Sequence, residues 1–211
     1  MSAHDPIQLQ LLSGLTELGI EADAATPLRR YLDLLTRWNQ TYNLTAIRDP
    51  AEMVGKHLLD SLSIAAEFDR QRLVDIGSGA GLPGIPLALV CPELRVTMVE
   101  SAGKKARFMR EAIRQLGLGD RVDVVEGRAE SLQRDGEYDC LSARALGTLA
   151  QLLTLGGHLL RPGGQLLAMK GKYPEEELAA LPAGYRLLDS RPLRVPGLDA
   201  ERHLLRIEKQ A

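Results

Sequence analysis

Three glycines at alternate positions are the first sign of chemistry in this chain. Gly77, Gly79 and Gly81 follow residues 73–76 (LVDI), which are apolar except for Asp75, and precede Leu82. Glycines between a strand and a helix let a ligand approach bare backbone, because no side chain stands in the way. Two templates fit this stretch. Starting at Gly77 it is G-x-G-x-G, the loop of S-adenosylmethionine enzymes, and starting at Gly79 it is G-x-G-x-x-G, the dinucleotide fingerprint.

An acidic residue further along supports an adenosine-type cofactor. Glu100 follows the glycines by about 20 residues, the distance at which an acid binds a ribose diol. It fits both templates and does not choose between them. Three features favour S-adenosylmethionine. The turn begins at Gly77, directly after the strand. Asp75 supplies a negative charge that suits a sulfonium and would repel a pyrophosphate. Finally, an antiparallel hairpin is expected to close the sheet.

Composition limits the class of protein. The chain has 211 residues, of which 45% are hydrophobic and 26% charged, as in an ordinary globular protein. No apolar stretch approaches the roughly 20 residues that span a bilayer, and the N-terminus lacks the basic start and apolar run of a signal peptide. Cys91 and Cys140 have no metal-ligand spacing. We expect a cytoplasmic monomer with no membrane contact and no metal site.

Charge is distributed unevenly along the sequence. The net charge of −2 by itself argues weakly against a nucleic-acid partner. Residues 101–121, however, carry six basic side chains against the two acids Glu111 and Asp120. A helix of this kind either faces phosphates or is a solvated face, and both interpretations stay open. The basic residues are Lys104, Lys105, Arg107, Arg110, Arg114 and Arg121.

The first third of the chain predicts three helices. The first is expected to stop at Gly19. The second is expected to begin with Thr26 as N-cap and Pro27 in the first turn, and the third with Asp49 as N-cap and Pro50 next. A polar connector, NQTYNLTAIRDP, joins the last two. The expected apolar faces are Leu9, Leu12, Leu15 and Leu18 in the first helix, and Leu28, Tyr31, Leu32, Leu35 and Trp38 in the second.

From residue 73 onward, strands alternate with helical segments, the pattern of a parallel sheet with covering helices. Residues 161–164, RPGG, are expected to end the last of these helices before the fifth strand begins. The runs at 185–195 and 202–208 leave no room for a helix between them and predict an antiparallel hairpin. The expected strands are 73–77, 96–100, 122–127, 138–143 and 165–171, and the expected helices are 85–90, 104–116 and 146–160.

Several specific stretches resemble one family. They are DIGSGAGLPGIPLAL, RWNQTYNLTAIRDPAEMVGKHLLDSL, SARAL, AMKG and the terminal ERHLLRI. Together they resemble the RsmG (GidB) family of small-subunit ribosomal RNA methyltransferases over nearly the whole chain. The resemblance implies an α/β, class I (Rossmann-like) methyltransferase fold with a mostly parallel seven-stranded sheet. It also implies a helical N-terminal extension, so we expect an extension of residues 1–68 and a methyltransferase domain of residues 69–211.

The implied activity is methylation of N7 of one guanosine in the decoding region of 16S rRNA, with S-adenosyl-L-methionine as cofactor. The resemblance puts cofactor contacts at Gly77, Leu82, Ala129, Glu130 and Arg144. The glycine pattern adds Gly79 and Gly81, and the ribose argument adds Glu100. From the residues alone, Glu130 is either an acceptor for the adenine amino group or a solvated loop acid. Arg144 is either a ligand contact or the partner of Asp139 or Asp75.

Guanine N7 carries an in-plane lone pair, so its methylation requires no general base and depends on alignment and electrostatics. Arg144 and Lys170 are the expected catalytic residues, with Lys170 contacting a phosphate or guanine O6. For Lys170, a plain surface lysine is the other interpretation. Asn43, Thr45 and Arg48 of the polar connector are expected to cover the substrate, mainly on the strength of the resemblance.

Two further pairs of polar residues have no assigned role at this point. His57 and Asp60 are three residues apart on one expected helix, and His203 follows Arg202. Each could contact RNA or simply pack. Other function classes stay open: a methyltransferase acting on another RNA or a small molecule, an NAD-dependent oxidoreductase, and a binding module that holds the cofactor without turnover.

Overall fold

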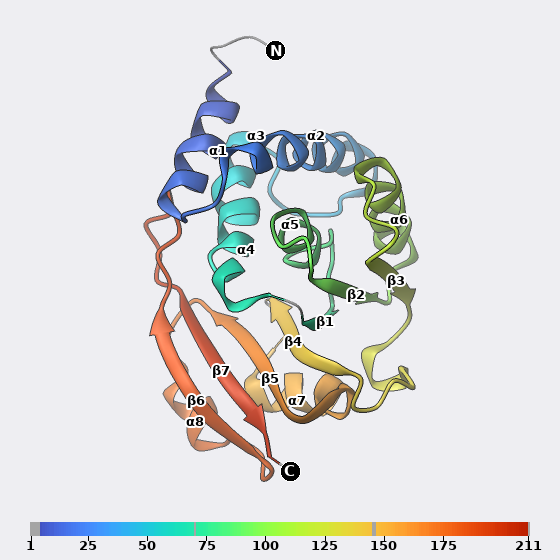
Figure 1. The fold of residues 1–211 in the computed structure, drawn as a ribbon, viewed down its shortest axis with the longest axis vertical. Coiled ribbons are helices and arrows are strands. Elements are labelled where there is room, and N and C mark those ends of the chain that lie inside the picture. Colours follow the sequence, from blue (N-terminus) through green and yellow to red (C-terminus); the bar gives the residue numbers. More distant parts are fainter. Residues whose placement is uncertain (1–4, 70, 145–146, 211) are drawn as a thin grey trace.

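The computed structural model describes residues 5–69, 71–144 and 147–210. Its centre is a seven-stranded sheet in the order β3-β2-β1-β4-β5-β7-β6 (Figure 1). The first five strands run parallel, and β7 is antiparallel to both β5 and β6. The predicted class I sheet with a closing antiparallel hairpin is therefore confirmed. The strands are β1 (Arg72–Ile76), β2 (Arg95–Glu100), β3 (Val122–Glu126), β4 (Tyr138–Arg144), β5 (Leu160–Lys170), β6 (Tyr185–Pro192) and β7 (His203–Lys209).

The order of the strands determines where a ligand can bind. The chain goes outward from β1 to β2 and β3, then returns to place β4 on the other side of β1. The strand order therefore reverses between β1 and β4. A crevice opens between them at the carboxyl ends of the strands, which is where open α/β sheets bind ligands.

The fifth strand differs from the prediction. β5 begins at Leu160 and includes residues 161–164, so the expected break at RPGG is wrong. Tyr138 pairs with Leu160 but Cys140 pairs with Gln165, which leaves the extra residues in a bulge. A bulge takes up proline and glycine because its residues leave the regular ladder. The preceding helix α7 covers only Leu149–Gly156 of the expected 146–160, and residue 146 lies outside the described residues.

Helices cover both faces of the sheet (Figure 1). The expected helix from residue 50 is a run of three segments, with a π-helix between two α-helical ends. The α-helices are α1 (Pro6–Glu17), α2 (Ala25–Tyr42), α3 (Pro50–Met53), α4 (Asp60–Leu62), α5 (Gly84–Val90), α6 (Gly103–Leu116), α7 and α8 (Glu175–Ala179). The π-helix is η2 (Val54–Leu59), and the 3-10 turns are η1 (Ala22–Ala24), η3 (Ala65–Glu67), η4 (Ala129–Ser131) and η5 (Gly157–Leu159).

The predicted start of a helix is correct where a side chain caps the first turn of the backbone. The Asp49 carboxylate accepts a hydrogen bond from the Ala51 amide, so the predicted cap is confirmed. The predicted cap at Thr26 is wrong, because η1 leads directly into α2 and the amides of the first turn follow an existing turn of helix.

In α1 the buried face contains Leu11 and Leu15, while Leu9 is 54% exposed. Positions three apart drift around a helix of 3.6 residues per turn.

The N-terminal helices share one hydrophobic core with the sheet. Four of the five residues on the predicted face of α2 (Leu28, Tyr31, Leu32 and Leu35) are fully buried, and the fifth, Trp38, is half-buried. The Tyr31 ring centroid lies 6.2 Å from that of Phe108 on α6.

The domain boundary between residues 68 and 69 stays a prediction. Within the described part of the chain, no helix is both long and apolar enough to cross a membrane.

Candidate cofactor and substrate site

The glycine loop after β1 is held in a conformation that glycine adopts easily. Gly77, Gly79 and Gly81 have φ angles of 64°, 59° and 84°, in the left-handed region that other L-residues rarely occupy. The amide of Gly77 donates to the carbonyl of Val99 at 2.8 Å, which ties the start of the loop to β2. From the other side, the buried Tyr31 hydroxyl donates to the carbonyl of Ala80 at 2.6 Å. The N-terminal helices therefore help to fix the loop.

The Asp75 side chain, near the end of β1, lies buried between β4 and the start of α5. Its carboxylate is fully buried and accepts from Ser142 Oγ at 3.0 Å and from the Gly84 amide at 3.3 Å. Burial raises the pKa of the carboxyl to about 7, against the hydrogen bonds from Ser142 and Ser78, which lower it. The side chain does not reach the cavity described below. Its side-chain contacts are with Ser142 of β4 and with Gly84 at the start of α5. The electrostatic role expected for its charge stays a prediction.

Glu100 connects the glycine loop to the end of β2. One carboxylate oxygen accepts from the Gly79 amide at 2.9 Å, and the other accepts from the Ala102 amide at 2.8 Å. The residue is 7% exposed and lies beside the cavity rather than on its lining. Each oxygen keeps a second lone pair, so the carboxylate can still accept from the hydroxyls of a ribose.

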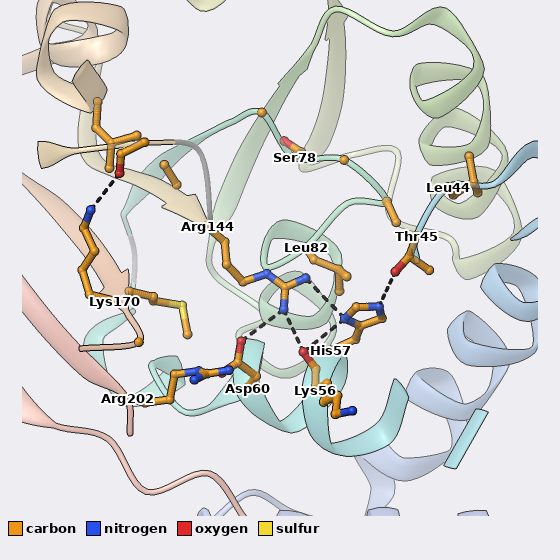
Figure 2. A pocket seen from close by; sticks show the side chains of 18 residues that line it. Leu44, Thr45, Lys56, His57, Asp60, Ser78, Leu82, Arg144, Lys170 and Arg202 are labelled. Atoms are coloured by element: carbon orange, nitrogen blue, oxygen red, sulfur yellow. Dashed lines mark hydrogen bonds and ion pairs between the residues drawn. The ribbon is translucent and has the colours of Figure 1, made fainter. Parts of the chain in front are cut away.

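A cavity of about 470 Å³ opens at the carboxyl edge of the sheet. Figure 2 shows the side chains that line it. They come from the polar connector, the π-helix, α4, α7, the ends of β1, β4 and β5, and the residue before β7. Six of the predicted site residues are on this lining: Thr45, Gly77, Gly79, Leu82, Arg144 and Lys170. The other six are off it: Asn43, Arg48, Gly81, Glu100, Ala129 and Glu130. The functional roles of all twelve stay predictions.

A shared carboxylate organises one wall of the cavity (Figure 2). Asp60 Oδ2 accepts from Arg144 at 3.1 Å, and Asp60 Oδ1 accepts from Arg202 at 2.9 Å. The Asp60 side chain is 5% exposed, while those of Arg144 and Arg202 are 20% and 26% exposed. Neither Asp139 nor Asp75 is the partner of Arg144. Asp139 pairs with Arg161, and the Asp75 carboxylate accepts from Ser142 and Gly84. Three segments distant in sequence meet at this carboxylate.

His57 stands next to this ion-pair cluster. Its Nδ1 lies 3.1 Å from the carbonyl of Lys56, and its Nε2 lies 2.8 Å from Thr45 Oγ1. Nδ1 also lies 3.5 Å from Arg144 Nη2. The carbonyl can only accept and the guanidinium can only donate, so the two Nδ1 contacts require opposite tautomers of the ring. Burial, followed by the nearby Arg144 guanidinium, lowers the pKa of the imidazole to about 4. His57 is therefore neutral at pH 7, and it fixes the position of Thr45.

Lys170 is on the opposite wall, and its charge is compensated. Its Nζ donates to the carboxylate of Glu177 on α8 at 2.8 Å and to the carbonyl of Gly147 at 2.7 Å. The Lys170 side chain is 15% exposed. A ligand that takes up the Lys170 ammonium group must compete with Glu177. The sequence analysis did not anticipate α8 or this ion pair.

The remaining predicted residues lie around the cavity. Asn43 ends α2 in the left-handed conformation, with φ 49°, and its side-chain oxygen accepts from Arg48 at 2.9 Å. Ala129 and Glu130 form the 3-10 turn that follows β3, and Glu130 is exposed and 3.5 Å from Arg128. They are therefore positioned at the end of the sheet beyond β2.

Sequence reasoning missed the roles of Asp60 and Arg202. The available signal was weak: His57 and Asp60 three residues apart on a helix, and an arginine before the last strand. Within the described ranges, no group of three His, Cys, Asp or Glu side chains is placed to hold a metal ion.

Comparison with known proteins identifies the family. The family model of rRNA small subunit methyltransferase G, GidB, matches residues 24–205. The chain belongs to this family. A ribosomal RNA small subunit methyltransferase G of Stenotrophomonas maltophilia is 61% identical over 210 residues, covering 98% of this chain and 99% of that protein. The protein of the same name from Xanthomonas campestris pv. campestris is 59% identical over 203 residues, covering 96% and 95%.

Solved structures support the fold of this GidB family member at low sequence identity. A SAM-dependent methyltransferase from Aquifex aeolicus is similar with a TM-score of 0.58 and 19% identity, covering 79% of this chain and 97% of that one. A SAM-dependent methyltransferase from Thiobacillus denitrificans, in complex with S-adenosyl-L-homocysteine, has a TM-score of 0.52 and 20% identity, covering 64% and 66%.

Proposed function

We propose that this chain transfers the methyl group of S-adenosylmethionine to N7 of a guanosine in 16S rRNA of the small ribosomal subunit. The names and the 59–61% identity of its relatives support the RNA substrate. The observation that carries the proposal is that the glycine loop and the polar connector line one cavity. A cofactor on the loop and a base under the connector would meet there. The protein would act in the cytoplasm as a monomer.

The loop fits the cofactor on steric grounds. A Cβ built on Gly79 would come no closer than 3.9 Å to another part of the protein, the carbonyl oxygen of Gly77. Packing within the protein therefore leaves room at Gly79, and that room opens onto the cavity. Gly77, Gly79 and Leu82 would contact the cofactor, Glu100 would accept from its ribose, and Ala129 and Glu130 would face its adenine. When bound, the cofactor supplies an electrophilic methyl group on a sulfonium.

The residues of the chain would hold the guanine rather than activate it. N7 is nucleophilic without losing a proton, so no general base is required. Arg144, Arg202 and Lys170 present N–H donors to the cavity, which suits acceptors such as O6 and phosphate oxygens. His57 is neutral at pH 7 and adds no charge that would oppose the positive charge developing on the purine. Asp60 supplies a carboxylate on the same wall.

The N-terminal part, residues 1–68, would serve as the substrate lid. The connector contributes Leu44 and Thr45 to the cavity. Asn43 and Arg48 stand just outside, where they would contact RNA as it enters. The Tyr31 hydroxyl ties this part to the glycine loop through the carbonyl of Ala80, so substrate and cofactor sites share one support.

Transfer of labelled methyl groups tests the proposal. The protein is incubated with labelled S-adenosylmethionine and, in parallel, with naked 16S rRNA, small subunits and large subunits. Label in 16S rRNA, at a position that cleaves with borohydride and aniline as N7-methylguanosine does, is the expected result. Label in another RNA, in protein or at another guanine atom would overturn the assignment. Calorimetric binding of NADH without binding of S-adenosylmethionine would indicate an oxidoreductase instead.

A further inference from the structure

An exposed tyrosine stands at the end of α2, next to the cavity. Tyr42 is 39% exposed. Its ring centroid lies 5.1 Å from that of Trp38, and Trp38 in turn lies 5.7 Å from Phe108 of α6. Tyr42 is the outermost ring of this aromatic row. It packs against Trp38, which in turn packs against the buried Phe108. Its orientation is fixed while part of its surface remains free.

Tyr42 is close to the substrate entrance. The chain continues from Tyr42 into the connector, where Leu44 and Thr45 line the cavity. Lys104 Nζ donates to the carbonyl of Tyr42 at 2.8 Å and so joins the end of α2 to the first turn of α6. Figure 1 shows these two helices side by side, with α6 following β2 and its ligand-facing end. The end of α2, which carries Tyr42, therefore lies beside the connector residues that line the cavity.

The cations beside Tyr42 are not neutralised by carboxylates. Lys104 donates to a carbonyl, and Arg48 donates to the side-chain oxygen of Asn43. Neither has a carboxylate within 4.0 Å among the residues that the structure describes, and the same holds for Lys105 and Arg107.

Other basic side chains of the same region are paired. Arg110 binds Glu126 at 2.9 Å, and Arg114 binds Glu111 at 2.7 Å. The basic stretch seen in the sequence thus divides in two. Its N-terminal half, next to Tyr42, keeps positive charge available for a polyanion. In its C-terminal half, Arg110 and Arg114 form ion pairs and Arg121 donates to backbone carbonyls.

We propose that Tyr42, Arg48 and Lys104, here called the aromatic corner, bind the single-stranded RNA that flanks the target nucleotide. The Tyr42 ring stacks on a neighbouring base, and the two cations contact phosphates. The inference rests on the proposed function. A base that enters the cavity leaves its stack, so its neighbour loses a stacking surface. An exposed, rigid ring at the entrance supplies a replacement, and base–aromatic stacking is tolerant of sequence.

Direct binding of RNA tests the stacking, with no need for methyl transfer. The probe is a single-stranded oligoribonucleotide of the 16S decoding sequence. The chain has one tryptophan, Trp38, whose fluorescence reports on the ring beside it. Wild-type protein and Tyr42→Phe are expected to bind with similar affinity and to show a change of Trp38 emission. Tyr42→Ala is expected to bind roughly 5- to 100-fold more weakly, with unchanged affinity for S-adenosylmethionine.

The cations are tested by the salt dependence of the same binding. Replacing one phosphate contact in a single-stranded complex lowers the slope of log K against log salt by about 0.7. Lys104→Gln is expected to show this decrease. Arg110→Gln is the matched control on the same helix, and its slope is expected to equal that of the wild type because Arg110 is paired with Glu126.

The outcomes separate this inference from the proposed function. Equal RNA affinity for Tyr42→Ala and wild type, or no RNA binding at all, overturns the aromatic corner. If 16S rRNA is still methylated with wild-type KM by Tyr42→Ala, the function stands and the corner is refuted. If the corner binds RNA as described but no methyl group reaches 16S rRNA, the proposed substrate is wrong and the RNA-binding surface stands. Loss of affinity for S-adenosylmethionine in Tyr42→Ala would mean that the ring has a structural role only.

Discussion

Replacing Asp60 with asparagine is expected to destabilise the fold and to impair catalysis together. The carboxylate is 5% exposed and accepts from both Arg144 and Arg202. An asparagine keeps one acceptor oxygen and turns an NH₂ group toward the other guanidinium. Removing one partner of a buried ion pair typically costs 3–5 kcal/mol, and because both arginines retain some contact with water we expect about 3 kcal/mol.

The expected loss can be measured in two ways. For a chain of this size it lowers the melting temperature by about 6–12 °C, and urea unfolding gives the free energy itself. Turnover in the methyl-transfer assay should fall roughly 10- to 100-fold, because Arg144 loses the contact that orients it toward the cavity. Asp139→Asn is the matched control: its ion pair with Arg161 is more exposed and is off the cavity lining, so we expect about 1 kcal/mol or less and wild-type turnover.

A specific result would refute this reasoning. If Asp60→Asn unfolds within about 0.5 kcal/mol of the wild type, which is the usual effect of a surface substitution, the carboxylate does not hold the two arginines together in solution. If it is destabilised as expected yet keeps full turnover, the cluster is structural and Arg144 is not positioned by it.

Three further outcomes follow from the site. Gly77→Val is expected to abolish binding of S-adenosylmethionine in calorimetry while circular dichroism shows an intact fold, because the side chain fills ligand space at φ 64°. Asp75 has a folded pKa of about 7 against 3.8, so the folded state holds a proton that the unfolded state has lost, and unfolding free energy falls as pH rises between these values. Asp75→Asn should remove that slope, by up to about 1.4 kcal/mol per pH unit in urea unfolding, and an unchanged slope would disprove the assignment. Lys170→Ala should reduce kcat far more than RNA affinity. Glu177→Gln leaves the ammonium group in place and should reduce kcat less. Equal kcat in the wild type and both variants would show that Lys170 has no part in catalysis.

Local patterns in the sequence predicted the elements that depend on local chemistry. Asp49 caps its helix because the capping group is part of the same turn. The hairpin of β6 and β7 was evident from two β-rich runs with a short connection. Thr26 failed as a cap because the preceding turn already supplies helical backbone, which a reading of side-chain types does not include. The prediction for RPGG was wrong for a related reason. These residues lie in a bulge of β5, and the bulge depends on how β5 pairs with β4.

The site was predictable to the extent that it lies on strand ends. Gly77 and Arg144 follow β1 and end β4, so the topology alone brings them to one edge. The contact of Asp60 with Arg202 joins residues far apart in sequence, and no spacing rule relates them. Lys170 was expected at the ligand edge, but its pairing with Glu177 depends on a short helix that has no clear periodicity in the sequence.

The π-helix has a consequence for which changes in chain length the protein tolerates. Val54–Leu59 fits one more residue into its turn than an α-helix does. Each residue of an α-helix turns the chain by about 100°. Losing Leu58 or Leu59 would restore regular helix, yet it would rotate His57 relative to Asp60, and one of the two would leave the cavity wall. A substitution at a nearby exposed position keeps the angle between His57 and Asp60 about the helix axis. An in-frame deletion of one codon between them changes that angle. The length of this segment is therefore as much a part of the site as its side chains.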